Sequence, residues 1–414
     1  MRMLWVRGLA GCALTAVFAW SVFWSVRLAE ADYWARQETV SGTEKALALT
    51  PGQAEYHVRM AKLLADSNPM RARAHLQEAL ALDLWDASSW IDLGFSHEAA
   101  GEFQEAEDCM LHAAAIDRQY LPRWTLANYY FRRGDQAKFW QWAKSAANMI
   151  YGDPLPLFRL CGMATEDGNL IERLGIRKPE LRAQYLGYLL DGGYLALTGP
   201  AVRAVLASGR EEDVPLLLAV CDRLLSQGRE EEALKIWNAL AAVRRIPYEP
   251  LDPHKGRVVT NGGFAVAPAP HGFDWRVPQL EGVSASEEES PRGLRLTFSG
   301  RQPEACEPLM QLIPVEEAAA YDVSFRYRTS SIPPDSGLRW RVTDEASHAL
   351  LAESAALSSD EPAEGGLWFR ALNGSRVVRL TLTYQRQPGT VRFEGYLVLF
   401  HVSVRPEPGW QGAK

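Results

Sequence analysis

The stretch that decides the fold is Trp90-Ile91-Asp92-Leu93-Gly94, followed by Gly101-Glu102-Phe103 and then by Ala106. A second tryptophan, Trp124, lies 34 residues after Trp90. A 34-residue period with these residue types predicts stacked helical hairpins, because a single hairpin cannot bury its apolar face alone. We therefore expect a solenoid that binds other molecules and no enzymatic activity.

The composition is that of a globular protein. The chain has 414 residues, of which 47% are hydrophobic and 23% charged, and this length suits about two or three domains. The net charge of -7 and the lack of a Lys/Arg-rich run exclude a nucleic-acid partner, because phosphate binding requires a basic face.

The best hairpin covers residues 87–118. Trp90, Leu93 and Gly94 fall on one face of its first helix, and Ala106 lies on the facing side of the second. Small residues at Gly94 and Ala106 allow the helices to approach closely. This pattern resembles the tetratricopeptide repeat, and the resemblance implies an all-α solenoid that binds proteins.

Weaker hairpins follow the same phase at 54–83, at 121–154 (which contains Trp124), at 179–209 and at 214–245. We therefore expect tetratricopeptide-like repeats over residues 43–246, which exceeds the three repeats that a stable stack requires. The concave face of a solenoid usually carries the binding residues, and the candidates there are Phe95, Glu98, Tyr129, Arg132 and Arg133. The alternative is that these side chains are solvated or packed between helices.

The N-terminus predicts a membrane anchor over residues 1–35. Arg2 and Arg7 precede a run at 8–26 that contains no charged residue, about long enough to span the ~30 Å hydrocarbon core. The flanking charges predict a single-pass protein of the inner (cytoplasmic) membrane with the bulk of the chain periplasmic or otherwise extracytoplasmic. The alternatives are cleavage at Ala31, after a small-x-small motif, and lipid attachment at Cys12.

Residues 247–257 contain three prolines and predict a linker. From there to residue 405, short runs of alternating apolar and polar residues predict an all-β jelly-roll sandwich. The runs lie at 294–298, 321–328, 338–342, 377–384 and 391–404.

The opening element Asn261-Gly262-Gly263-Phe264 and the strands after it resemble carbohydrate-binding modules with a galactose-binding-like fold. The resemblance implies sugar binding by exposed aromatic rings, for which the candidates are Trp275, Trp340, Trp368 and Tyr384. Aromatic residues on alternating strands also commonly face the core, so this alternative stays open.

No motif for catalysis, for a cofactor or for a metal is found. Glu287-Glu288-Glu289 lies in a Ser/Glu-rich segment that we interpret as a solvated loop. The whole arrangement resembles tetratricopeptide proteins of bacterial exopolysaccharide synthesis and export. We expect a non-catalytic, membrane-anchored scaffold with protein partners; the alternatives are a polysaccharide-binding protein and, more remotely, a glycoside-active enzyme.

Overall fold

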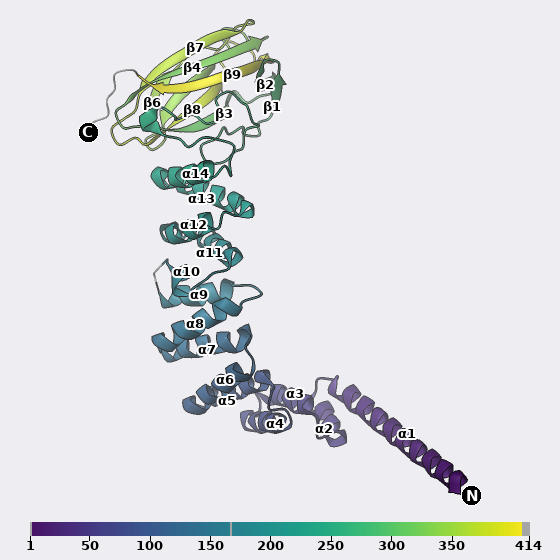
Figure 1. The fold of residues 1–414 in the computed structure, drawn as a ribbon. Helices are drawn as coiled ribbons and strands as arrows, with labels where there is room; N and C mark the ends of the chain where they lie inside the picture. Colours follow the sequence, from purple (N-terminus) through teal and green to yellow (C-terminus); the bar gives the residue numbers. More distant parts are fainter. Residues whose placement is uncertain (1, 166–167, 408–414) are drawn as a thin grey trace. The chain divides into compact units, whose positions relative to one another are not determined.

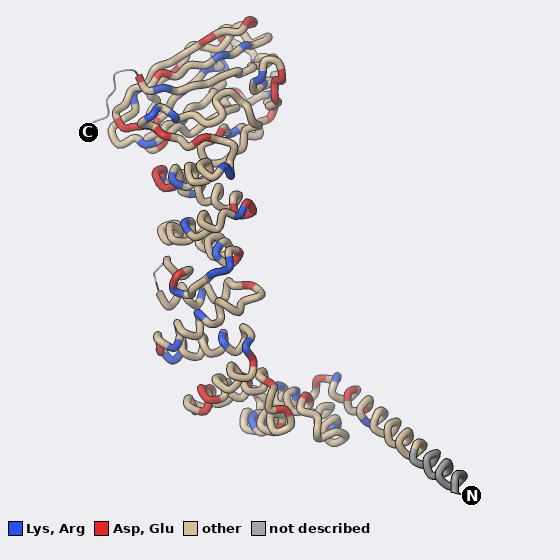
Figure 2. The backbone as a smooth tube through the Cα atoms, viewed as in Figure 1, with Lys and Arg blue, Asp and Glu red and all other residues tan. Residues whose placement is uncertain are grey.

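The structure is a computed structural model that describes residues 2–165 and 168–407, with side chains from residue 14 onward. The chain divides into two compact units, with the boundary in the sequence between Leu181 and Arg182. The first unit is helical. The second combines further helices with a β-sandwich (Figure 1). Basic and acidic residues are interspersed over both units in the view of Figure 2.

The first unit contains α1 to α10 and the start of α11, and its helices pack in consecutive pairs: α3 with α4, α5 with α6, and α7 with α8. Their bounds are α1 (Arg2–Ala35), α2 (Val40–Leu49), α3 (Ala54–Leu64), α4 (Pro69–Leu82), α5 (Ala87–Ala99), α6 (Phe103–Ile116), α7 (Tyr120–Arg133), α8 (Gln136–Met149), α9 (Leu155–Ala164) and α10 (Leu170–Arg173). The predicted helical hairpins are thus confirmed.

Side-chain caps begin several of these helices. The Asn68 side chain accepts a hydrogen bond from the Arg71 amide at the start of α4, and Pro69 occupies the first helical position. The Asp86 carboxylate caps α5 in the same way. Such caps satisfy amides that have no partner within the helix.

The hairpin α5–α6 closes over Gly94. A Cβ atom there would lie 3.0 Å from Met110 Cγ and 3.3 Å from the Ala106 carbonyl oxygen, so the two helices touch at this point. Leu93 and Ala106 are buried. Trp90 is half-buried, and its indole N–H donates to the Leu84 carbonyl at 3.0 Å.

Trp124, at the equivalent position of α7, is also half-buried and stacks on Tyr120 at 6.1 Å between ring centroids. Both tryptophans therefore lie at the edge of the helical core.

The predicted membrane anchor at the N-terminus is wrong. Among the residues that the structure describes, no helix is both long enough and apolar enough to cross a membrane. This finding contradicts the predicted anchor over residues 1–35 and the inner-membrane location. Residues 8–13 of the predicted span, including Cys12, lie outside the residues whose side chains are described.

The second half of α1 packs on the repeats instead. Ala31 and Ala35 are fully buried against α2 and α3, where they contact Ala46 and Tyr56. Arg27 directly follows the apolar run, and its Nε atom donates to the Leu49 carbonyl at 2.6 Å. The charged half of the predicted segment is thus part of the helical stack.

The second unit begins with four helices: most of α11 (Pro179–Asp191), then α12 (Thr198–Leu206), α13 (Val214–Ser226) and α14 (Glu230–Ala242), with single 3-10 turns at Leu195–Leu197, Glu211–Asp213 and Pro253–Lys255. Gly193, in the turn between α11 and α12, has φ +72°. This conformation is accessible to glycine at little cost.

The β-sandwich consists of two antiparallel sheets, one with the order β1-β2-β9-β4-β7 and one with the order β3-β8-β5-β6. The strands are β1 (Val283–Glu289), β2 (Arg292–Ser299), β3 (Ala305–Pro314), β4 (Ala320–Ser330), β5 (Leu338–Asp344), β6 (Leu350–Glu353), β7 (Ala363–Arg370), β8 (Val377–Gln385) and β9 (Glu394–Pro406). The predicted sandwich is confirmed. The Glu287–Glu289 run, predicted as a loop, belongs to edge strand β1.

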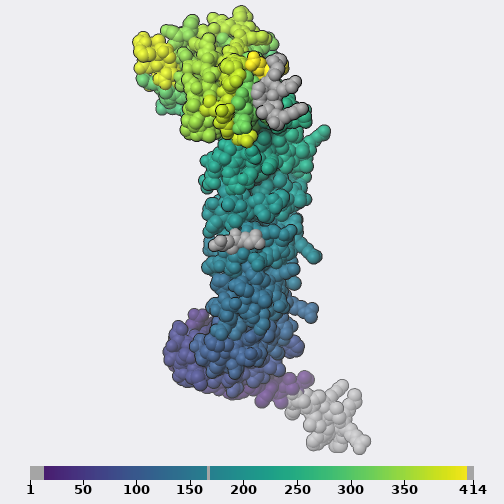
Figure 3. All heavy atoms as spheres, turned by 90° about the vertical axis from the view of Figure 1, so that its left-hand side faces the viewer, coloured from purple at the N-terminus to yellow at the C-terminus, as the bar shows by residue number. Residues whose placement is uncertain are grey.

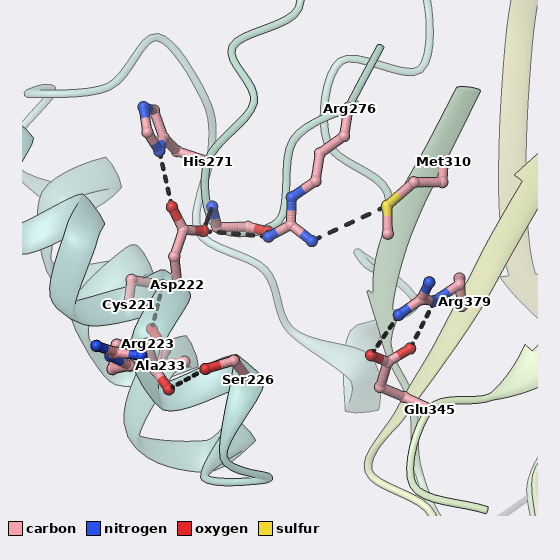
Figure 4. A network of polar contacts seen from close by, with 11 residues as sticks. Cys221, Asp222, Arg223, Ser226, Ala233, His271, Arg276, Met310, Glu345 and Arg379 are labelled. Atoms are coloured by element: carbon pink, nitrogen blue, oxygen red, sulfur yellow. Dashed lines mark hydrogen bonds and ion pairs between the residues drawn. The ribbon is translucent and has the colours of Figure 1, made fainter. Parts of the chain in front are cut away.

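A polar cluster joins α13 to the segment that leads into the sandwich. The Asp222 carboxylate accepts from the Gly272 amide at 2.7 Å and pairs with His271 at 2.7 Å and Arg276 at 3.1 Å (Figure 4). The Arg276 backbone pairs with Met310 on β3. In the space-filling view the sandwich rests directly on the last helices (Figure 3).

An aromatic cluster, here called the Trp237 joint, lies beside this network. Trp237 on α14 stacks on Tyr248 at 5.7 Å and meets Phe273 edge-on at 5.9 Å. The Tyr248 hydroxyl donates to buried Asp274 at 2.6 Å. Gly272, at φ +54°, lies directly over the Trp237 ring. The last hairpin therefore packs against the segment that leads into the sandwich.

Candidate functional site

A groove of about 340 Å³ opens between three consecutive helices of the first unit, and we call it the α3–α5 groove. It is lined by Ala61, Lys62, Ala65, Pro69, Ala72, Leu76, Asp92, Phe95, Ser96 and Ala99. Most of these side chains are apolar and several are alanines. The small side chains leave space between helices that are otherwise closely packed.

The groove has a buried floor and an aromatic rim. Ala61, Ala72 and Leu76 are each 5% exposed or less, whereas Phe95 on α5 is 42% exposed. A large apolar side chain at the edge of an apolar depression is a common anchor for a partner protein.

Lys62 and Asp92 place charge in this apolar surface. Burial raises the pKa of the Asp92 carboxyl, and the positive charge of Lys62 opposes the shift. The groove therefore offers one acidic and one basic group in a partly desolvated setting. Such groups fix the orientation of a ligand that apolar contacts hold.

Arg73 holds the walls of the groove together. From α4 its guanidinium donates to the Ser96 carbonyl at 2.9 Å on α5 and to Glu102 at 2.7 Å, at the start of α6. Glu102 also accepts from His97 at 2.5 Å. These contacts lower the pKa of Glu102, with the His97 hydrogen bond as the largest cause. These contacts link α4 to α5 and to the start of α6 in the absence of a ligand.

Of the five predicted concave-face residues, only Phe95 lines the groove. Glu98 and Arg132 form a two-pronged ion pair with N–O distances of 2.9 and 2.7 Å. Tyr129 is buried and donates to the Phe103 carbonyl at 2.8 Å. The Arg133 guanidinium lies 3.6 Å from the centre of the Phe103 ring. These four residues join neighbouring helices in the structure.

The sequence analysis missed Lys62, Asp92 and Ser96, which lie on the first helices of successive hairpins. The sequence contains a pattern that could have indicated the groove. Small or polar residues recur on the first helices, at Ala61 and Ala65 in one hairpin and at Ser96 and Ala99 in the next.

In the sandwich, three of the four aromatic candidates lie in the core. Trp275 and Trp340 are 0% exposed and Tyr384 is 1% exposed. Stacking on a sugar requires an open ring face, which these three rings lack. Trp368 on β7 is 50% exposed and is the candidate that remains.

Trp368 lies on the outer face of the five-stranded sheet. It is opposite Asp322 on β4, which is opposite Arg405 on β9. Its indole N–H donates to Glu407 at 3.3 Å. Gly366, two residues earlier on the same face, leaves bare backbone beside the ring. A flat ring with acidic and basic neighbours can contact a polyhydroxylated ligand.

Within the described part of the chain, no three His, Cys, Asp or Glu side chains are grouped so that they could hold a metal ion. The described cysteines Cys109, Cys161, Cys221 and Cys306 are unpaired. Burial raises the pKa of the Cys161 thiol to about 12, so this thiol stays protonated at neutral pH. A buried, protonated thiol of this kind is a poor nucleophile.

No protein-family model matches this sequence, and no curated protein matches it. Among solved structures, a crystal structure of MamA shares 19% identity with this chain at a TM-score of 0.25. The similarity covers 27% of this chain and 66% of that chain, which is just under two thirds of its length. A structure described as CBM4 shares 12% identity over 36% of this chain and 99% of that chain, at a TM-score of 0.28.

A third structure, of YrrB, is described as a TPR protein with an unusual peptide-binding site. It shares 18% identity over 49% of this chain and 92% of that chain, at a TM-score of 0.23. All three TM-scores are below 0.5, and the function of the chain is therefore inferred below from its own geometry.

Proposed function

We propose that this protein is a non-catalytic scaffold that binds an apolar segment of a partner protein in the α3–α5 groove. The observation that carries the proposal is an apolar groove with Phe95 exposed at its rim and the charges of Lys62 and Asp92 inside it. A helical solenoid presents surfaces of this kind to protein partners.

The size of the groove suits a few side chains of a short peptide segment. Its volume of about 340 Å³ lies at the lower end of the usual range for ligand pockets, about 300–1,000 Å³. We expect a partner segment with two or three apolar side chains and polar groups that pair with Lys62 and Asp92. An amphipathic helix and an extended strand both present side chains in this way.

The test is a peptide selection against the purified full chain from a random displayed library, followed by anisotropy titration of an enriched peptide. Phe95→Ala should weaken binding by about tenfold or more, because central aromatic anchors carry most of the binding energy. Ala65→Trp should block the groove and weaken binding at least as strongly. Trp85→Ala is the matched control, since Trp85 is 78% exposed and lies outside the groove.

Circular dichroism of each variant would verify that the helices remain folded. If the enriched peptides bind Phe95→Ala and Ala65→Trp as tightly as the unmodified chain, the groove is not the binding site.

A second candidate function is glycan binding by the sandwich, and the exposed Trp368 ring favours it. Protein-binding repeats next to a glycan-binding sheet would bring a polymer and a partner together, and we propose exopolysaccharide assembly or export as the setting. Retardation of the full chain in native gels that contain polysaccharide tests this function. Trp368→Ala should abolish the retardation, whereas Leu350→Ala, at another exposed position of the sandwich, should not.

A further inference from the structure

Two histidines on neighbouring helices of the first unit contact each other through their rings. His57 lies on α3 and His75 on α4, and their Nδ1 atoms are 3.1 Å apart. The second nitrogen of His57, Nε2, lies 3.1 Å from the Pro51 carbonyl oxygen. Both side chains are half-buried. The α3–α5 groove does not include either ring.

The contacts determine which nitrogen carries each proton. A carbonyl oxygen only accepts hydrogen bonds, so His57 Nε2 must carry the proton that it donates to Pro51. In the neutral ring, His57 Nδ1 then holds a lone pair, and His75 Nδ1–H must be the donor. A single proton therefore occupies the space between the two Nδ1 atoms.

A metal ion can replace that proton. Metal–imidazole bonds of about 2.0–2.1 Å and the observed separation of 3.1 Å give an N–metal–N angle of about 95–100°. This angle is close to that between neighbouring ligands in square-planar or octahedral coordination, which copper(II) and nickel(II) adopt. His75 would move its proton from Nδ1 to Nε2, and both rings would turn so that their Nδ1 lone pairs point to the ion.

The surroundings support a ligand role for His57. Metal-binding histidines commonly donate their other N–H to a carbonyl or carboxylate group, and His57 already does so toward Pro51.

The charges around His75 are mixed. Glu44 and Glu78 favour a cation near this ring, whereas Arg71 opposes it. Arg71 is itself paired with Glu44 at 3.5 Å, which reduces its effect. The same ion pair also reduces the effect of Glu44, so Glu78 is the carboxylate that favours a dication at this site.

We propose that His57 and His75 form an open two-imidazole site for one copper(II) or nickel(II) ion, with water in the remaining coordination positions. The ion would link α3 to α4, the two helices that form adjacent walls of the α3–α5 groove. Binding would therefore stabilise this hairpin, whether or not the groove binds a partner.

The test is titration of the full chain, without a histidine tag, with copper(II) at pH 7 under isothermal calorimetry. We expect one ion per chain at the site, and binding weaker by about tenfold or more in His57→Asn and in His75→Asn. His348→Asn, which changes an exposed histidine of the sandwich, is the matched control and should bind as the unmodified chain does.

Pulsed electron paramagnetic resonance of the copper-loaded, unmodified chain counts the bound imidazoles and does not depend on how the variants fold. Two equivalent imidazoles support the proposal. One imidazole, or copper binding that both substitutions leave unchanged, overturns it.

Discussion

The substitution Gly272→Ala tests whether the Trp237 joint holds α14 against the segment that leads into the sandwich. The new Cβ atom would lie 2.4 Å from Trp237 Cε3 and 2.5 Å from Cζ3, about 1 Å closer than the ordinary carbon contact of about 3.5–4.0 Å. The Trp237 ring has little room to retreat, because it is 1% exposed and lies between Tyr248 and Phe273.

Two costs add in this variant. Alanine in the left-handed region, at φ +54°, costs about 1–2 kcal/mol, and overpacking costs a further 1–3 kcal/mol or so. The expected loss is about 2–5 kcal/mol. Amide exchange in α14, measured by mass spectrometry, should accelerate by about 30-fold to 4,000-fold if the joint controls local opening.

Gly374→Ala provides the matched control. Gly374 has φ +79°, and no heavy atom lies within 4 Å of its hypothetical Cβ, so only the backbone term of about 1–2 kcal/mol applies. If α14 exchanges no faster in Gly272→Ala than in Gly374→Ala, the Trp237 joint does not hold α14 against the segment that leads into the sandwich.

Three further outcomes are expected. In thermal unfolding, Gly94→Leu should destabilise the chain by about 1–3 kcal/mol through overpacking, whereas Gly187→Ala, with open space around its Cβ, should stabilise α11 by up to about 1 kcal/mol; equal effects would contradict the packing at Gly94. Since the folded-state pKa of His75 is lowered, the folded chain binds fewer protons than the unfolded chain, and stability should fall as the pH drops below about 6.5. The melting temperature of His75→Asn should therefore depend less on pH than that of the unmodified chain, and an equal dependence would refute this. Trp275→Ala should cost about 3–5 kcal/mol, whereas Trp368→Ala should change the free energy of unfolding by no more than about 0.5 kcal/mol, and urea titration distinguishes the two.

The sequence predicted the helical hairpins and most strands because both have a clear period. The turn at Gly101 and the close approach at Gly94 follow from residue type alone. Edge strand β1 was not predicted, because nearly all of its side chains face water and its residues therefore do not alternate between apolar and polar. The helix at residues 2–35 was recognised, but not the packing of Ala31 and Ala35 on the repeats.

The candidate sites were harder to predict than the fold. Phe95 was found because it lies at an outward position of a first helix. Lys62 and Asp92 were not, because their proximity depends on how α3 and α5 pack across α4. Tyr129 was a candidate for the concave face, with packing between helices as the alternative. The alternative holds, because its hydroxyl reaches the Phe103 carbonyl of the preceding hairpin and the ring is buried. Periodicity identifies a face of a helix, but not the neighbour that covers it.

The Trp237 joint also bears on how genes for such chains can recombine. A crossover near codon 257, between the last helix and the first strand, would replace Gly272 and Phe273 and leave Trp237 with Tyr248 as its remaining aromatic neighbour. A crossover near codon 182, at the sequence boundary between the two compact units, would keep the joint intact. We therefore expect α11 to α14 and the sandwich to be inherited together as one cassette, and natural fusions to vary the number of hairpins before it.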